Sequence, residues 1–325
     1  MKIRGLNVAL CTTLPRWRAR QFHNQPVDSH LHGFLVDLWA AVRGESGGRL
    51  AVSVHQQTAG VAGSDPQALQ MLMSSELEFQ SLMGGILAQH VPAADLQALP
   101  FAYRDHRQVH AAMAGDLGDY IRGAMRACGI HGFRHGVLEN GFRQMFGCAR
   151  AIHGAADLEG FRMRIPQGRM FRQVFEALGA TPVTVNINGL YDALADGTVD
   201  GHENPLVVHA VNRLYEVSRY ISVTNHMWSG LNLIANLAFW NGLPEDVRAI
   251  VERNLKLYCD RQRAYTDRFN RDALARLQCE RGMQVNQADG ASFRARLTGD
   301  FYRRWRAEFG ATAWGLLEAQ AGRLV

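Results

Sequence analysis

The segment 157–205 constrains the fold more than any other part of this 325-residue chain. Apolar residues alternate with arginines over 161–165, which is typical of a β-strand, and a proline ends the run. Further spacing patterns follow in order: helical at 170–178, alternating at 183–187, helical at 190–194 and extended at 198–201. This strand–helix–strand–helix–strand order predicts an open α/β sheet.

Two polar residues of this segment mark a candidate binding edge. Arg164 lies near the end of the first predicted strand, and Asn204 lies just past the end of the third. Open α/β sheets bind ligands at the carboxyl ends of their strands. A guanidinium forms a planar two-bond fork with a carboxylate, and an amide can both donate and accept. The segment therefore predicts a site for a small anion.

Several motifs of the chain resemble one family in both content and order. They are ALPFAYRD at 98–105, NGFRQ at 140–144, GFRMRIP at 160–166, LGATPV at 178–183, YDALADGTVDGHENP at 191–205, YEVSRY at 215–220 and TNH at 224–226. This pattern resembles the substrate-binding subunits of tripartite ATP-independent periplasmic (TRAP) transporters, the DctP type. The resemblance covers residues of about 35 to 285.

The resemblance implies a two-lobed periplasmic-binding-protein fold of type II, with hinge strands and one long helix that spans both lobes. We expect the first lobe to hold 1–140 and 230–269, and the second 141–229 and 270–325. The implied function is capture of a small organic acid anion in the cleft between the lobes. The protein would deliver the anion to the small and large TRAP membrane subunits for sodium-coupled uptake, without transforming it. The alternative is an enzyme or a ligand-sensing domain on the same fold, since fold does not fix function.

The family pattern also assigns roles to single residues. Arg164 matches the arginine that holds the ligand carboxylate, whereas Arg162 is expected to be solvated. Arg143 and Asn204 match further pocket residues, and Glu203 is expected to be structural. The remaining candidates are Asp65, which could instead cap a helix, Met83 with Gly84, Ile187 as apolar wall, and Trp228, which could stack on a ligand or pack between the lobes. Such a wall favours an aromatic, keto or hydroxy monocarboxylate over a densely polar sugar acid.

The amino-terminal part of the chain repeats the alternation of strands and helices, whereas the carboxyl-terminal part contains one long helix. In the amino-terminal part we expect strands at 5–11, 50–54 and 77–83, an irregular stretch at 12–28, and helices at 31–42, 65–73, 107–114 and 116–128. Strands at 131–139 and 142–149 would cross into the second lobe. After Pro244 neither glycine nor proline occurs before Gly282, which predicts one helix of ~37 residues and ~55 Å.

Composition argues against several other classes. The net charge is +5, but 33 of the 35 basic residues are arginines spread along the chain, so no nucleic-acid partner is expected. The pairs His30/His32, His106/His110 and His131/His135 have ligand-like spacing, yet no carboxylate or cysteine is expected to complete a set. We therefore expect no metal site and no cofactor. The five cysteines are expected to be small apolar residues, with a Cys128–Cys148 disulfide left open.

Localisation follows from the resemblance. The family is exported to the periplasm, whereas Met1 leads directly into an alternation at Leu6, Val8 and Leu10 without a signal-peptide pattern. We therefore expect a periplasmic protein whose leader is missing from this sequence.

Overall fold

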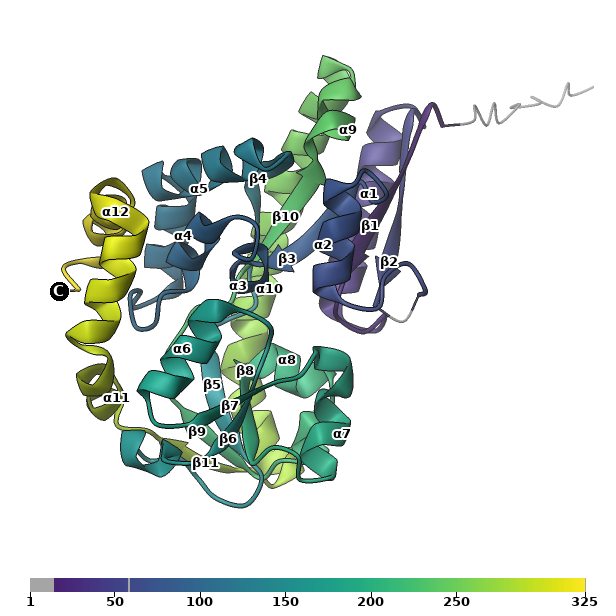
Figure 1. Ribbon diagram of the computed structural model, residues 1–325. Helices are drawn as coiled ribbons and strands as arrows, with labels where there is room; N and C mark the ends of the chain where they lie inside the picture. The colour runs from purple at the N-terminus through teal and green to yellow at the C-terminus, as the bar shows by residue number, and fades with distance from the viewer. Residues whose placement is uncertain (1–14, 58, 325) are drawn as a thin grey trace, which may run out of the picture.

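The chain folds into two lobes, each built on one β-sheet, as the computed structural model of residues 15–57 and 59–324 shows (Figure 1). The two-lobed α/β architecture confirms the predicted fold class. The strand predicted at 5–11 lies outside the described residues.

The sheet of the first lobe has the strand order β2-β1-β3-β10-β4. Its strands are β1 (Trp17–His23), β2 (Leu50–Gln56), β3 (Phe79–Met83), β4 (Ile130–Leu138) and β10 (Leu231–Asn236). β1 runs parallel to β2 and β3, whereas β10 runs antiparallel to β3 and β4. A strand from late in the chain therefore closes the gap between two early ones.

Strand β1 occupies part of the stretch that was predicted to be irregular, so that prediction was wrong. Gln21 and His23 of this strand are fully buried although they are polar. Hydrogen bonds hold the Gln21 side chain, which donates to Ser81 Oγ at 2.8 Å and accepts from Trp39 Nε1 at 2.7 Å. Polar core residues of this kind remove the apolar alternation by which a strand is recognised in a sequence.

The sheet of the second lobe has the order β11-β9-β5-β8-β6-β7. Its strands are β5 (Arg143–Gly147), β6 (Arg162–Ile165), β7 (Thr181–Thr184), β8 (Gly201–Pro205), β9 (Tyr220–Val223) and β11 (Gln284–Gln287). β6 pairs in parallel with both β7 and β8, as the strand–helix–strand pattern predicted. β8 begins where the predicted extended piece at 198–201 ends, so Asn204 lies inside the strand rather than beyond it.

Helices cover the two sheets (Figure 1). In the first lobe they are α1 (His30–Glu45), α2 (Asp65–Met73), α3 (Gly84–Leu87), α4 (His106–Ala114), α5 (Asp116–Ala127) and α9 (Leu237–Gly242), with a 3₁₀ helix η1 (Pro92–Ala98). In the second they are α6 (Arg169–Ala177), α7 (Leu190–Ala195) and α8 (Leu206–Val211), with η2 (Ala155–Leu158), η3 (Ile187–Gly189) and η4 (Leu214–Glu216). An apolar stripe of α6, with Met170, Phe171, Val174 and Phe175 fully buried, fixes that helix against the second sheet.

Four segments connect the lobes in the described part of the chain. The chain crosses once between β4 and β5 and once between β9 and β10, and Phe142 pairs with Trp228 in an antiparallel bridge between these crossings. The third connection is α10 (Glu245–Arg281), which contacts α1 and β4 of the first lobe and α8 of the second. Gly282 ends this helix in the left-handed conformation, with φ of 68°, which glycine adopts without strain. The predicted 37-residue spanning helix is thereby confirmed.

The last two helices return from the second lobe to the first. α11 (Gly290–Leu297) contacts α6, whereas α12 (Asp300–Ala321) packs on α4 and α5 (Figure 1). The boundary expected from the sequence places all of 270–325 in the second lobe, whereas α12 contacts helices of the first. Among the described helices, none is both long and apolar enough to cross a membrane. Cys128, Cys148, Cys259 and Cys279 are free thiols.

Candidate functional site

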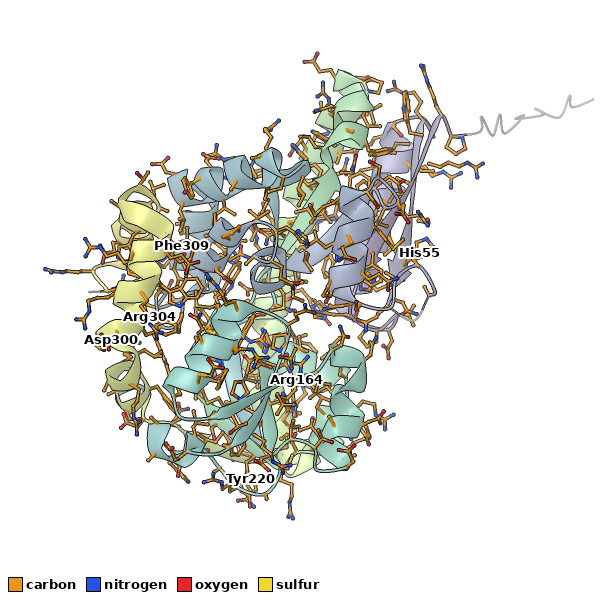
Figure 2. All side chains as sticks on the ribbon, in the orientation of Figure 1. His55, Arg164, Tyr220, Asp300, Arg304 and Phe309 are labelled. Atoms are coloured by element: carbon orange, nitrogen blue, oxygen red, sulfur yellow. The ribbon has the colours of Figure 1, made fainter. Side chains whose placement is uncertain are left out.

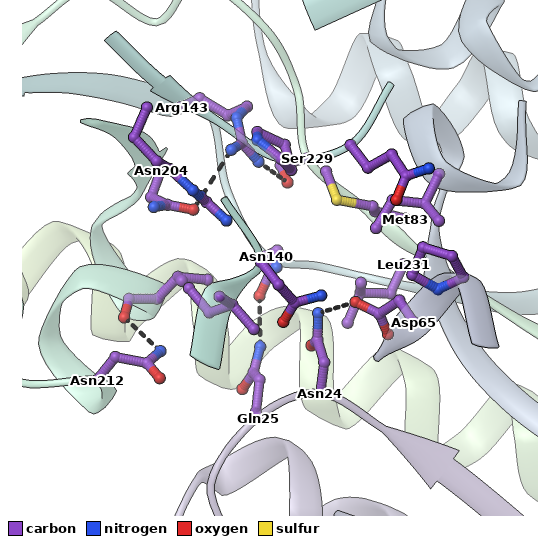
Figure 3. A pocket seen from close by; sticks show the side chains of 18 residues that line it. Asn24, Gln25, Asp65, Met83, Asn140, Arg143, Asn204, Asn212, Ser229 and Leu231 are labelled. Atoms are coloured by element: carbon purple, nitrogen blue, oxygen red, sulfur yellow. Dashed lines mark hydrogen bonds between the residues drawn. The ribbon is translucent and has the colours of Figure 1, made fainter. Parts of the chain in front are cut away.

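A cavity lies between the lobes, and most of the residues that line it carry polar side chains (Figure 3). Eleven of the eighteen lining residues carry polar or charged side chains: Asn24, Gln25, Asp65, Asn140, Arg143, Arg164, Gln167, Asn186, Asn204, Asn212 and Ser229. The apolar remainder consists of Pro66, Met83, Ile86, Pro166, Ile187, Val208 and Leu231. A ligand of this cavity would therefore meet hydrogen-bonding groups from both lobes.

Arg164 is a buried cation of the cavity whose terminal guanidinium N–H groups have no hydrogen bond to the described residues. Its side chain is 2% exposed and comes from β6, on the face of the second lobe that is directed toward the first (Figure 2). Within the described residues, Arg164 Nε donates a hydrogen bond to Val185 O at 2.8 Å. Burial, together with the charge of Arg143, lowers the pKa of Arg164 to about 9. Glu203 partly opposes this shift through its charge, but among the described residues no carboxylate forms an ion pair with the terminal guanidinium nitrogens. A ligand carboxylate could form that pair.

Arg143 also lines the cavity, but the protein already uses most of its donors. Nε and Nη2 form a fork with the carboxylate of Glu203, and Nη2 also reaches Glu203 O at 2.8 Å. Nη1 donates to Ser229 Oγ at 2.9 Å. Of the five guanidinium N–H groups, one on Nη1 is left for a ligand. Burial alone would raise the pKa of Glu203, but Arg143 and His226 hold it below its usual range.

Asn204 has an amide orientation that its neighbours determine. Its Oδ1 accepts from Arg143 Nη2 at 3.3 Å (Figure 3), and its Nδ2 lies 3.0 Å from His202 Nδ1. Burial keeps the pKa of His202 well below its usual value, so the ring is neutral and Nδ1 can accept from the amide. The second Nδ2 hydrogen is then available as a donor in the cavity. Arg164 and Asn204 together offer N–H groups, which suits an anion.

Asp65 is the acidic residue of the cavity, on the side of the first lobe. Ser64, not Asp65, caps α2, because the Ser64 side chain accepts from Gln67 N. Asp65 Oδ2 accepts from Asn24 Nδ2 at 2.5 Å, while its buried Oδ1 has no partner among the described residues. Burial raises the pKa of Asp65 to about 7, although the bond from Asn24 opposes the shift. The helix-capping alternative is therefore excluded for Asp65, and its carboxyl group is free to contact a ligand hydroxyl.

We expect Asp65→Asn to change how stability depends on pH. A folded-state pKa of about 7, above the ordinary aspartate pKa of 3.8, means that the folded protein binds the proton more tightly than the unfolded chain. The contribution of Asp65 to the free energy of unfolding is therefore fully present below pH ~4 and is lost as the pH rises through 7. In urea unfolding, the unfolding free energy of the variant relative to the wild type should increase by on the order of 2 kcal/mol between pH 5 and 7.5. Parallel pH curves for the two proteins would contradict this expectation.

The other predicted ligand residues divide into two groups. Met83 and Ile187 line the cavity, whereas Gly84 and Trp228 are not among its lining residues. A Cβ on Gly84 would lie 1.6 Å from Gln97 Nε2, so this glycine is required by packing within the first lobe. Trp228 is 1% exposed and donates from Nε1 to Glu139 Oε1 at 2.9 Å. This burial does not support the ligand role predicted for Trp228. It agrees with the alternative prediction, in which Trp228 packs inside the protein.

Sequence analysis missed several lining residues that carry amides. Gln25, which donates from Nε2 to Asn140 Oδ1 at 2.9 Å, lies in the stretch that was considered irregular, as does Asn24. Asn140 belongs to the NGFRQ motif, and Asn186 caps η3 through a bond from Asn188 N to its side chain. The signal that could have identified them is their position in turns, directly beside predicted strands.

The two lobes touch at the rim of the cavity. Gln57 Nε2 donates to Asn186 Oδ1 at 3.1 Å, and Asn188 Nδ2 donates to Gly63 O at 3.2 Å. On another side, a Cβ on Gly85 of the first lobe would lie 2.3 Å from the Phe171 ring of the second. The lobes thus enclose the cavity, and the small size of Gly85 permits this close approach.

Comparison with known proteins identifies the family. The family model described as bacterial extracellular solute-binding protein, family 7 (DctP), matches residues 22–305. The chain belongs to this family. Its members are described as bacterial extracellular solute-binding proteins. The resemblance stated from the sequence motifs is confirmed.

Relatives of this solute-binding protein carry different names. It is 31% identical to the C4-dicarboxylate-binding periplasmic protein DctP of Rhodobacter capsulatus, over 64% of this chain and 59% of that one. It is 28% identical to a solute-binding protein of Verminephrobacter eiseniae, over 83% of this chain and 79% of that one. The chain thus spans less than two thirds of the first relative.

Solved structures share the fold over almost the whole chain. A TRAP periplasmic solute-binding protein from Sulfitobacter with bound β-D-galacturonate has a TM-score of 0.87 at 23% identity, covering 94% of this chain and 100% of that one. The sugar acid-binding protein DctPAm from Advenella mimigardefordensis, in complex with galactonate, has a TM-score of 0.87 at 24% identity, covering 94% and 98%. At these identities the likeness establishes the two-lobed fold.

Proposed function

We propose that this family member is a periplasmic protein that captures a hydroxylated carboxylate in the cavity. The observation that carries the proposal is Arg164, a 2%-exposed guanidinium whose terminal nitrogens form no ion pair with a carboxylate of the described chain. A carboxylate would complete this pairing through two parallel N–H···O bonds, a geometry that lysine cannot reproduce. Asn204 would contribute a further donor, and the ligand would be released unchanged.

The polar wall supports a ligand that carries hydroxyl groups. Asp65 Oδ1, Asn24 and Gln25 line the cavity from the first lobe, and Asn186 lines it from the second, beside Arg164. Each of them could accept from or donate to a ligand hydroxyl. A buried polar group without a partner costs free energy, so an apolar ligand would leave these groups unsatisfied. The preference for an apolar wall, which rested partly on Trp228 and Gly84, therefore needs revision. Solved structures of the same fold that hold β-D-galacturonate or galactonate are consistent with a sugar acid.

Transport would follow from closure of the lobes. Ligand contacts made from both lobes would favour the closed form, in which the rim bonds of Gln57 and Asn188 are present. The closed form would then dock on the small and large TRAP membrane subunits for sodium-coupled uptake. Family membership supports this partnership, and the sharing of contacts between two lobes supports the closure.

A thermal-shift panel tests the ligand class. Galactonate and glucuronate are expected to raise the melting temperature, because ligand at 100 times Kd adds ~2.7 kcal/mol of apparent stability. Hexanoate, which keeps the carboxylate but has no hydroxyls, and galactitol, which keeps hydroxyls but has no carboxylate, are expected to give little shift. A shift with hexanoate alone would contradict the hydroxyl requirement. A shift with galactitol equal to that with galactonate would contradict the anion site.

A further inference from the structure

The hinge contains a cluster of metal-ligating side chains that the cavity does not use. His106 and His110 lie one turn apart on α4, and Glu139 follows β4 where the chain leaves the first lobe. Glu139 Oε2 lies 2.8 Å from His106 Nδ1 and 2.7 Å from His110 Nε2. The three potential ligand atoms lie within 4.8 Å of one another. The carboxylate missing from the His106/His110 pair in the sequence is thus supplied from 29 residues away.

The charge of this cluster is not balanced by a permanent cation. The Glu139 side chain is 1% exposed, and within the described chain its ion-pair partners are His106 and His110 alone. The other buried glutamate described above, Glu203, is instead paired with an arginine. A buried carboxylate is stable in a protein when a cation or a metal ion compensates it. Glu139 therefore depends on whatever positive charge its two histidines or their ligand provide.

The surroundings of Glu139 leave one oxygen free to bind a metal ion. Oε1 accepts from Trp228 Nε1 at 2.9 Å and from Gly141 N at 2.6 Å, which fixes the plane of the carboxylate. The Glu139 backbone N–H donates to Gln262 Oε1 at 2.8 Å and so ties the residue to α10. Oε2 is left facing the two imidazoles. Hydrogen bonds of this kind around ligands are typical of metal sites in proteins.

The distances are close to those that a metal ion requires. Bonds of about 2.0–2.1 Å in a tetrahedral arrangement place ligand atoms roughly 3.3 Å apart. The His106 and His110 nitrogens would need to move from Glu139 Oε2 by only about 0.5 Å, since they lie 2.8 and 2.7 Å away. Each imidazole would then carry its proton on the other ring nitrogen, His106 Nε2 and His110 Nδ1.

Access from solvent is provided by a groove beside the cluster. His106 is one of its lining residues, together with Phe142, Asp267, Asn270 and Arg271, and the His106 side chain is 35% exposed. An ion could enter through this groove, and a water molecule from it could occupy a fourth coordination position. An acidic residue, Asp267, lies along the same path.

We infer that His106, His110 and Glu139 form a binding site for a divalent transition-metal ion such as Zn²⁺, with the fourth position open to water. Two imidazoles and one carboxylate form a donor set that suits zinc and cobalt. The ion would connect α4 to the crossing segment that leads from Glu139 to Arg143. Trp228 bonds to Glu139, and its neighbour Ser229 bonds to Arg143, so the site is connected to the cavity without being part of it.

Cobalt titration of chelator-treated protein tests the inference directly. Co²⁺ is expected to bind at one ion per chain and to give the visible absorption of a four-coordinate nitrogen–oxygen site, which Zn²⁺ then abolishes by displacement. His110→Gln and His106→Gln are each expected to weaken Zn²⁺ binding by at least about 100-fold. His106 is partly exposed, so His106→Gln remains informative if His110→Gln fails to fold.

His131→Gln is the matched control, because His131 Nε2 also lies near a carboxylate, Glu252, at 3.8 Å, but without a second histidine. Zn²⁺ affinity of this control is expected to equal that of the wild type. The inference is overturned if wild-type protein binds neither ion, or if the control loses as much affinity as the cluster variants. In those cases protons on His106 and His110 balance Glu139. Neither result depends on the identity of the ligand in the cavity.

Discussion

Arg164→Ala is expected to reduce ligand affinity by roughly 100- to several-thousand-fold, equivalent to about 3–5 kcal/mol. The variant would leave the ligand carboxylate buried without its counter-charge, because Arg143 is already neutralised by Glu203. Isothermal titration with the ligand found in the thermal-shift panel measures the effect. The melting temperature of the ligand-free variant should stay near or above that of the wild type, since the change removes an uncompensated buried cation.

Two further variants separate charge from geometry at this site. Arg164→Lys keeps the positive charge but loses the planar fork, and we expect binding to weaken roughly 10- to 100-fold. Arg162→Ala is the control on the same strand, because its side chain is 46% exposed and pairs with Asp200. Surface pairs contribute little, so affinity should change by less than about threefold. Loss of binding in Arg162→Ala, with Arg164→Ala unaffected, would mean that the ligand lies elsewhere.

The second large effect is expected on stability. Glu203→Ala should lower the free energy of unfolding by about 3–5 kcal/mol, because it leaves the charge of Arg143 buried without a partner. Both side chains are at most 3% exposed, and Glu203 also faces His226 at 3.4 Å. Urea unfolding monitored by tryptophan fluorescence measures the loss.

Glu216→Ala is the matched control for this variant. Glu216 also pairs with an arginine, Arg213, but three residues away and at the surface, where the arginine side chain is 69% exposed. We expect little change in the unfolding free energy for this control. Equal losses in Glu203→Ala and Glu216→Ala would show that burial of the Arg143 pair does not determine its contribution.

Several features of the fold could be predicted from the chain because they depend on local physical chemistry. The helix from Glu245 to Arg281 is recognisable since nothing between Pro244 and Gly282 interrupts a helix, and both ends carry suitable residues. β6 and α6 are recognisable because their apolar residues recur with periods of two and about 3.6. The Arg164 site followed from the family motif and from the position of the residue at a strand end.

Features that depend on buried polar contacts could not be predicted in this way. β1 was missed because Gln21 and His23 are buried through hydrogen bonds to distant side chains, and β8 was displaced because His202, Glu203 and Asn204 occupy core positions as polar residues. Neither strand shows apolar alternation. Gln21 is bonded to Ser81 and Glu203 to Arg143, each 60 residues away, and only the folded chain brings these groups into contact.

The sequence by itself determined the two-lobed α/β class, the long helix, the family and the arginine at the end of β6, since each follows from local spacing or a continuous motif. The tertiary structure decided which residues share a cavity or a cluster. It removed Trp228 and Gly84 from the cavity wall, supplied Asn24 and Gln25 instead, and brought Glu139 between His106 and His110. The physical reason is that hydrogen bonds and ion pairs act over about 3 Å in space, whatever the separation along the chain.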